Sequence, residues 1–142
     1  MIHFFLDTNI VIDFLTDRSP FAQSAARLFD YAEKGKVKLY LTAVSYNNTY
    51  YIIRNLTSHK EAIKTMKALE ELTETVDTTA AAVKSALKSD FKDFEDAIQY
   101  FAAKENSMLN GIVTRNVSDF KRSSLAIWTP EQAVNLVEQA GI

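Results

Sequence analysis

The stretch Ile2-His3-Phe4-Phe5-Leu6-Asp7-Thr8-Asn9 decides how this chain folds. Four of the five residues before Asp7 are apolar or aromatic, which is typical of a buried strand. An acid, a hydroxyl and an amide follow, and Ile10 to Leu15 is an apolar run with helical spacing. The sequence therefore predicts a strand that ends in an acidic turn and leads into a helix. Because ligands of open α/β sheets bind at the carboxyl ends of the strands, Asp7 is placed to handle a metal or a phosphate.

The chain has 142 residues, of which 47% are hydrophobic and 24% are charged. This is typical of one globular domain, so we expect residues 1–142 to form a single domain. The chain contains no cysteine, which excludes disulfides and thiolate metal sites. The first strand begins without a signal-peptide pattern, and no apolar run approaches the length of a membrane span. We therefore expect a soluble, cytoplasmic protein that does not enter a membrane.

Charge and glycine content narrow the function classes further. The net charge is −2, which does not favour non-specific binding to nucleic acid. The chain has only three glycines, and none of them builds a Gly-rich phosphate-binding loop. The Walker loop and the dinucleotide-binding fingerprint are therefore excluded.

Strands and helices are predicted to alternate along the rest of the chain. Further strands are predicted at Val37–Leu41, Asn110–Thr114 and Leu125–Ile127, with Val76 in a connector or a short strand. Helical spacing runs from Thr42 to Leu56 and from Phe94 to Asn106, and Asp77 and Thr129 are the predicted N-caps of two further helices. This alternation predicts an α/β fold with a parallel sheet covered by helices on both faces.

Several polar side chains are expected at one edge of this sheet. Asp119 follows the predicted strand Asn110–Thr114 by a few residues. Asp93 and Asp96 are three residues apart at the start of the helix before that strand, so they share one helix face. Glu95 is expected to point off that face. Together with Asp7, these acids would repel one another unless a proton or a cation neutralises them.

Oxygen ligands without cysteine point to a hard cation, Mg²⁺ or Mn²⁺. Such an ion polarises a phosphoryl oxygen and lowers the pKa of a bound water. Each acid also has a simpler explanation. Asp7 alone could be a helix N-cap, Asp93 fits a cap better than a ligand, and Asp119 could be a loop residue. The metal interpretation depends on the acids meeting at the same edge.

Three motifs in this order resemble those of the PIN-domain nucleases. They are Leu6-Asp7-Thr8-Asn9, Asp93-Phe94-Glu95-Asp96-Ala97 and the stretch from Val113 to Phe120. The chain is most similar to the toxin ribonucleases of bacterial toxin–antitoxin pairs. The resemblance implies a three-layer α/β/α fold with a central parallel sheet and an endoribonuclease that depends on Mg²⁺ or Mn²⁺. It also implies an antitoxin protein as partner and a homodimer.

The resemblance assigns roles to individual residues. Asp7, Asp96 and Asp119 are the candidate catalytic and metal-binding residues. The residues expected to support them or to orient the substrate are Asn9, Asn48, Asp93, Thr114 and Asn116. The three basic residues beside Asp119, expected to contact the RNA backbone, are Arg115, Lys121 and Arg122.

One position departs from the family pattern. The family usually carries an acidic residue, most often Glu, early in the helix after the second strand, where this chain has Asn48. Asn offers a carbonyl oxygen but no charge. Two alternatives follow. One is a PIN-like domain that binds RNA or protein without catalysis. The other is a phosphatase or a receiver domain. A phosphatase is disfavoured because Asp7 is followed by Thr8-Asn9 rather than by Asp-x-Asp spacing, and a receiver domain because no matching acidic pair and late Lys appear.

Overall fold

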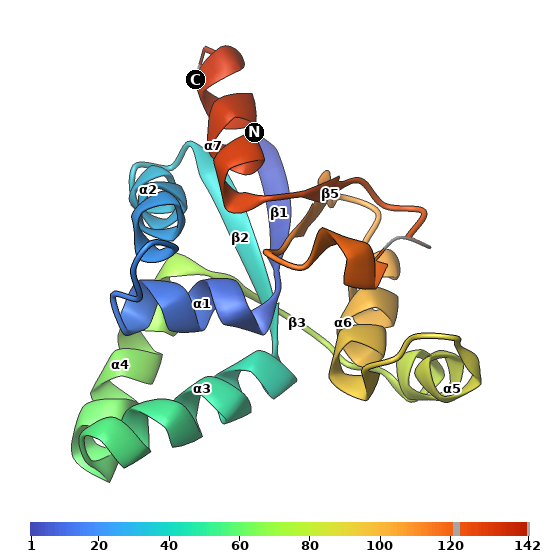
Figure 1. Ribbon diagram of the computed structural model, residues 1–142, viewed down its shortest axis with the longest axis horizontal. Coiled ribbons are helices and arrows are strands. Elements are labelled where there is room, and N and C mark those ends of the chain that lie inside the picture. The colour runs from blue at the N-terminus through green and yellow to red at the C-terminus, as the bar shows by residue number, and fades with distance from the viewer. Residues whose placement is uncertain (121–122, 142) are drawn as a thin grey trace.

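A five-stranded parallel sheet forms the centre of the molecule (Figure 1). The computed structural model describes residues 1–120 and 123–141. The strands are β1 (Ile2–Leu6), β2 (Val37–Thr42), β3 (Glu74–Val76), β4 (Gly111–Val113) and β5 (Ile127–Trp128). Their order across the sheet is β3-β2-β1-β4-β5. The predicted parallel sheet is confirmed.

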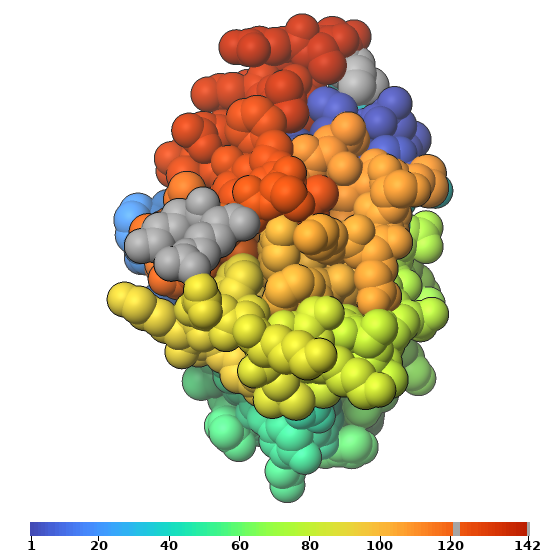
Figure 2. All heavy atoms as spheres, turned by 90° about the vertical axis from the view of Figure 1, so that its right-hand side faces the viewer, coloured from blue at the N-terminus to red at the C-terminus, as the bar shows by residue number. Residues whose placement is uncertain are grey.

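Helices cover both faces of the sheet, which confirms the predicted three-layer α/β/α fold. The described helices are α1 (Thr8–Leu15), α2 (Ala22–Glu33), α3 (Ala43–Leu56), α4 (His59–Leu72), α5 (Ala80–Lys88), α6 (Phe94–Lys104) and α7 (Pro130–Gln139). Figure 1 shows α1 to α4 on one side of the sheet and α5 and α6 on the other. Figure 2 views the molecule from the side of α5 and α6. No helix among the described residues has the length and apolarity needed to cross a bilayer.

The strand pleat divides the core into two clusters. Phe4 and Leu6 of β1 point to the face packed against α1, α2, α4 and α7. Phe5, between them, points to the opposite face and packs with Ile112 and Tyr100 of α6. Both faces of β1 are therefore buried, which explains why its sequence is apolar at consecutive positions rather than at alternate ones.

The strand order changes direction between β1 and β4. From β1 the chain first builds outward through β2 to β3, and then returns to place β4 and β5 on the other side of β1. Leu6 of β1 is paired with Val113 of β4, so both strands end at the same level. Crevices at such switch points are where open α/β sheets bind ligands. Asp7 and Thr114 are the residues that directly follow these two strand ends.

Side-chain caps start several of the helices. Thr129 caps α7 with the predicted capping box, in which Gln132 bonds back to the Thr129 backbone. The predicted cap at Asp77 was wrong, because α5 starts at Ala80 and is capped by Thr79, whose hydroxyl accepts from the Ala82 N–H at 3.1 Å. The hydroxyl of Thr79 also donates to Glu105 at the end of α6, at 2.7 Å. This tertiary contact favours Thr79 over Asp77.

Candidate active site

Asp7 is held between the ends of β1 and β4. It is 3% exposed, and its N–H donates to the carbonyl of Val113 at 3.0 Å. Its carboxylate accepts a hydrogen bond of 2.8 Å from the hydroxyl of Thr114. The Thr114 oxygen in turn accepts from the N–H of Asn116 at 3.0 Å. The residues predicted on the two strand ends are thus linked in one chain of hydrogen bonds.

The carboxylate of Asp7 does not serve as a helix cap. Asp7 occupies the N-cap position of α1, but its side chain makes no capping hydrogen bond there. Burial raises the pKa of Asp7, and the hydrogen bond from Thr114 opposes this rise. The negative charge of Asp119 raises the pKa of Asp7 further. The simple N-cap explanation therefore does not account for this acid.

The start of α6 brings the second group of acids. Asp93 is exposed and acts as the N-cap, since its Oδ1 accepts from the Asp96 N–H at 3.0 Å. Asp96 is half-buried. Burial is the main cause that raises the pKa of Asp96 to about 7, and the charges of Asp7, Asp93, Asp119 and Glu95 add to the shift. Every acid predicted at this edge of the sheet therefore contributes to the raised pKa of Asp96.

Asp119 lies on a short 3-10 helix that follows β4, η1 (Val117–Phe120). The Asp119 side chain is exposed, and its N–H donates to the carbonyl of Asn116 at 2.9 Å. A pocket of about 220 Å³ lies beside it and is lined in part by Asp93, Asp96 and Phe91. Acids from two segments, α6 and η1, therefore border the same hollow in the surface.

Glu95 lies on the α6 face of Gln99 rather than on the face of Asp93 and Asp96, and it is still close enough to Asp7 to be affected by its charge. Its Oε1 accepts from the amide of Asn48 on α3, and its Oε2 accepts from the amide of Gln99 at 3.1 Å. Burial raises the pKa of Glu95, and the nearby charge of Asp7 raises it further. The sequence of α6 alone did not indicate that α3 would supply a hydrogen-bond donor to Glu95. Asn48 itself contacts Glu95.

A network of buried polar side chains links the helices that carry the acids. Gln99 is fully buried, and its amide also donates to the hydroxyl of Thr8 at 3.2 Å. The hydroxyls of Thr8 and Ser45 share a hydrogen bond of 2.7 Å. The network joins the first turn of α1, which carries the half-buried Asn9, to α3 and α6. Sequence reasoning missed Gln99 because a single glutamine among apolar helix residues has no distinguishing local pattern.

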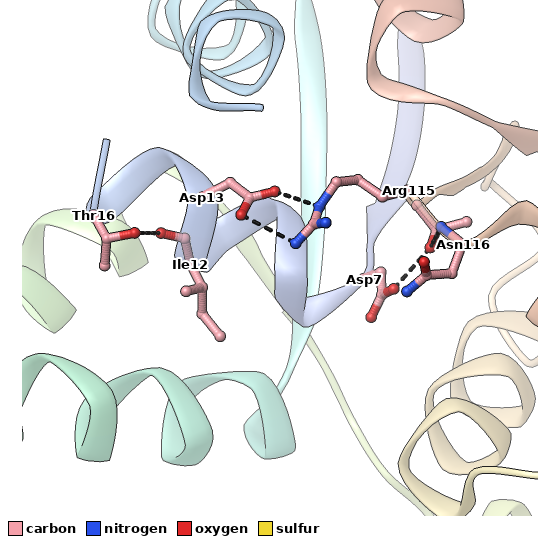
Figure 3. A network of polar contacts seen from close by, with 7 residues as sticks. Asp7, Ile12, Asp13, Thr16, Arg115 and Asn116 are labelled. Atoms are coloured by element: carbon pink, nitrogen blue, oxygen red, sulfur yellow. Dashed lines mark hydrogen bonds and ion pairs between the residues drawn. The ribbon is translucent and has the colours of Figure 1, made fainter. Parts of the chain in front are cut away.

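Arg115 does not extend toward the acids. Its Nε pairs with the carboxylate of Asp13 at 2.7 Å (Figure 3). Its guanidinium lies 4.0 Å from the ring centroid of Phe21. Asp13 is 1% exposed, so this is a buried partner. Contact of Arg115 with RNA stays a prediction. The other two predicted RNA contacts, Lys121 and Arg122, lie outside the described residues.

Comparison with known proteins identifies the family. Residues 3–118 match the family described as the PIN domain, which is most of the chain. The chain belongs to the PIN domain family. This confirms the resemblance drawn from the sequence motifs and disfavours the phosphatase and receiver alternatives.

Solved structures share the fold of this PIN domain. The DNA-bound VapBC complex from Salmonella typhimurium aligns with a TM-score of 0.69 at 16% identity and covers 92% of this chain and 99% of the other. VapC20 from Mycobacterium tuberculosis, named as a toxin that cleaves the sarcin-ricin loop, aligns with a TM-score of 0.59 at 18% identity over 77% of this chain and 86% of the other. The FitAB complex bound to DNA gives 0.63 at 20% identity, over 89% and 94%. No curated protein matches the chain.

The acids of this PIN domain fit a hard cation by their chemistry. All the groups are oxygen donors, and none of the described ion pairs involves Asp7, Glu95 or Asp96. Their geometry is open, because in residues 1–120 and 123–141 no three acidic or histidine side chains stand close enough to hold one ion. Binding would therefore draw the carboxylates closer together.

Proposed function

We propose that this protein is a metal-dependent endoribonuclease that hydrolyses RNA phosphodiester bonds. The observation that carries the proposal is the group of acids around the half-buried Asp96. Burial is the main cause that raises the pKa of Asp96 to about 7, and the charges of Asp7, Asp93, Asp119 and Glu95 add to the rise. Acids gathered without a paired lysine or arginine are costly in a folded protein, and a bound cation removes that cost. Perturbed acids beside a pocket are typical of functional sites.

The roles of the acids follow from their positions. Asp7, Asp96 and Asp119 would hold Mg²⁺ or Mn²⁺. Such an ion, when bound, polarises a phosphoryl oxygen and lowers the pKa of water. Thr114 holds the Asp7 carboxylate in place through its hydroxyl. Asp93 fixes the first turn of α6 and thereby the position of Asp96.

The asparagines are proposed to orient these groups or the substrate. Asn116 donates its N–H to Thr114, which is the residue that positions Asp7. Asn48 donates its amide to Glu95. Asn9 lies in the first turn of α1, two residues after Asp7. None of the three carries charge, so their contribution is directional rather than electrostatic.

The substrate is proposed to be RNA, held through its backbone by Arg115, Lys121 and Arg122. Contacts to phosphate position a nucleic acid without reading its sequence. One solved structure with the same fold is that of a toxin named for cleaving the sarcin-ricin loop. This likeness supports an RNA target as a class and does not specify the cleavage sequence.

The biological partner is proposed to be an antitoxin protein, with the toxin itself a homodimer. Several structures with this fold are toxin–antitoxin complexes. One of them is from Klebsiella pneumoniae, and the alignment covers 96% of its chain. Expression of the protein alone should arrest bacterial growth, and co-expression of the protein encoded by the neighbouring reading frame should restore it. Light scattering coupled to gel filtration measures the oligomeric state.

A nuclease assay tests the catalytic proposal directly. Purified protein should cleave single-stranded RNA with Mn²⁺ or Mg²⁺, and EDTA should abolish cleavage. Asp7→Asn keeps the shape of the side chain but removes its charge, so it should reduce the rate by at least about a hundredfold. Glu131→Gln, an exposed acid at the start of α7, is the matched control and should retain full activity. Full activity in Asp7→Asn would refute the proposal.

The second candidate function is a PIN domain that binds RNA or protein without cleaving it. Two observations favour it. Position 48 has no charge, and no three described acids stand close enough to hold an ion. Calorimetry separates the two functions. Mn²⁺ binding supports the nuclease, whereas RNA binding that is unchanged by EDTA, without Mn²⁺ uptake, supports the alternative.

A further inference from the structure

Glu95 lies where α3 and α6 meet at the carboxyl end of the sheet. Figure 1 shows the starts of these two helices facing each other there. Both oxygens of the Glu95 carboxylate accept hydrogen bonds, one from the amide of Asn48 on α3 and one from the amide of Gln99 on its own helix, at 3.1 Å. Two donors from two helices therefore fix the direction of this side chain.

The surroundings of Glu95 do not explain it as a structural ion-pair residue. None of the described lysine or arginine pairs includes Glu95. The side chain is half-buried, and among the charges that act on it are those of Asp7 and Asp93, both negative. A carboxylate kept partly out of water beside like charges is destabilising unless something positive joins it.

A second, independent observation concerns Gln99. Its side chain is fully buried, and its amide nitrogen serves both Glu95 and Thr8. Its Oε1 is buried without a hydrogen-bond partner among the described residues. Buried polar atoms are rarely left unpaired in folded proteins. The Gln99 oxygen is thus an unsatisfied acceptor on the same amide group that donates to the Glu95 carboxylate, as expected of a site that takes a hydrated cation.

From these contacts we infer that Glu95 is a further metal-binding carboxylate, which supplies from α6 the charge that Asn48 does not supply from α3. Asn48 and Gln99 are the positioning residues that hold Glu95 toward Asp7 and Asp96. The inference rests on the proposed function, because it assigns a ligand to the proposed cation. It also gives Asn48 a specific role as the hydrogen-bond donor to Glu95, so that position 48 is more than a site where the family's usual acid is missing.

The contact between Asn48 and Glu95 makes the inference testable by exchanging the two groups. In Asn48→Glu/Glu95→Gln the carboxylate moves to α3 and the amide moves to α6. The hydrogen bond between the two positions can form again with donor and acceptor reversed, and the total charge of the site is unchanged. Glu95→Gln alone removes one charge while keeping the shape. The exchange therefore separates the loss of a carboxylate from the loss of a particular residue.

The measurement is the affinity for Mn²⁺ alone, by isothermal titration calorimetry and by the electron paramagnetic resonance signal of free Mn²⁺, at pH 8. Glu95→Gln should weaken binding at least about tenfold, the lower range for the loss of a group that supports a metal site. The exchanged double variant should regain most of the wild-type affinity. Glu131→Gln removes an acid from the first turn of a different helix, α7, and it should bind like the wild type.

The outcomes distinguish this inference from the proposed function. If the wild type does not bind Mn²⁺, both are overturned. If the wild type binds and Glu95→Gln binds equally well, only the role of Glu95 is overturned. Circular dichroism verifies the fold of each variant. Should Glu95→Gln fail to fold, Glu95→Asp replaces it as the test. The shorter acid retains the charge but reaches less far, so unchanged Mn²⁺ affinity in Glu95→Asp would also overturn the inference.

Discussion

The hydroxyl of Thr114 donates a 2.8 Å hydrogen bond to the buried carboxylate of Asp7, and the two residues are 107 positions apart in the sequence. This bond connects the ends of the two central strands at the point where the sheet changes direction. It also holds the charged oxygen of Asp7 in one orientation, since Thr114 is fully buried and has little freedom to move.

Thr114→Val should weaken the site while preserving its shape. A hydrogen bond to a charged group contributes about 1.5–3 kcal/mol, so Mn²⁺ affinity should fall about tenfold or more. Calorimetry measures the change. Thr65→Val is the control, because it removes a hydroxyl that donates only to the backbone of α4, at 3.0 Å. Equal Mn²⁺ affinity in Thr114→Val and the wild type would show that the bond does not serve the metal site.

The raised pKa of Asp96 predicts a pH-dependent cost in stability. Its folded pKa of about 7 is above the ordinary value of 3.8, so the folded protein binds a proton that the unfolded chain has released. Stability without metal is therefore lost as the pH rises from about 4 through 7. Asp96→Asn should stabilise the protein at pH 8 by on the order of 1 kcal/mol, allowing for solvent screening at a half-exposed group. At pH 3.5 the gain should vanish. Thermal denaturation in EDTA measures both, and an equal gain at both pH values would contradict the assignment.

Metal binding should depend on pH through the same proton on Asp96. Below pH 7 a cation must displace the proton from Asp96, so Mn²⁺ affinity should rise by up to about tenfold per pH unit between pH 5.5 and 7 and then level off. Calorimetry in buffers of different ionisation enthalpy counts the protons released. A flat affinity across this range would mean that Asp96 is already ionised in the free protein.

The pair of Asp13 and Arg115 predicts a loss of stability rather than a simple loss of RNA binding. Arg115→Ala leaves the carboxylate of Asp13 buried and unpaired, which costs about 3–5 kcal/mol. Urea denaturation measures this loss. Asp13→Asn combined with Arg115→Met removes both charges and should recover much of it. If Arg115→Ala instead keeps its stability and only binds RNA more weakly, the RNA-contact prediction is the better one.

Gly111 should tolerate no side chain. A Cβ at this position would lie 2.6 Å from the carbonyl oxygen of Ala126 and 2.6 Å from the indole nitrogen of Trp128. Gly111→Ala should therefore push β5 away from β4 and lower the free energy of unfolding by about 1–3 kcal/mol or more. Gly35→Ala is a useful comparison, because its Cβ meets nothing within 4 Å and only its positive φ of 74° opposes the change. Gly111 also has a positive φ, of 153°, so Gly111→Ala combines backbone strain with crowding. Chemical denaturation should therefore show the larger loss of stability in Gly111→Ala.

Much of the fold was predictable because local sequence patterns determine it. The apolar run of β1 and the capping box at Thr129 both match the structure. The convergence of Asp7 and Asp96 followed from the rule that parallel strands end at one edge, and the mutual effect of the two acids on the pKa of Asp96 is consistent with it. The cap at Thr79 was missed because Asp77 is as good a cap by sequence, and the choice depends on Glu105, which is 26 positions away.

The missed parts of the site all depend on partners from distant segments. Arg115 looked like a free cation beside Asp119, whereas its partner Asp13 lies 102 positions earlier, on α1. The direction of Glu95 depends in part on Asn48, which is 47 positions before it and lies on another helix. Residue type and spacing within one helix contain no record of such contacts.

The strand order has a consequence for how the protein is made. β4, which carries Thr114 to Asp7, is inserted beside β1 only after β2 and β3 are already in place along the chain. A ribosome therefore has to add 107 residues after the first aspartate before its partner hydroxyl exists, and the last acid follows at position 119. Contacts of such long sequence separation form late in folding. A nascent chain that ends before residue 119 thus cannot assemble the acid cluster.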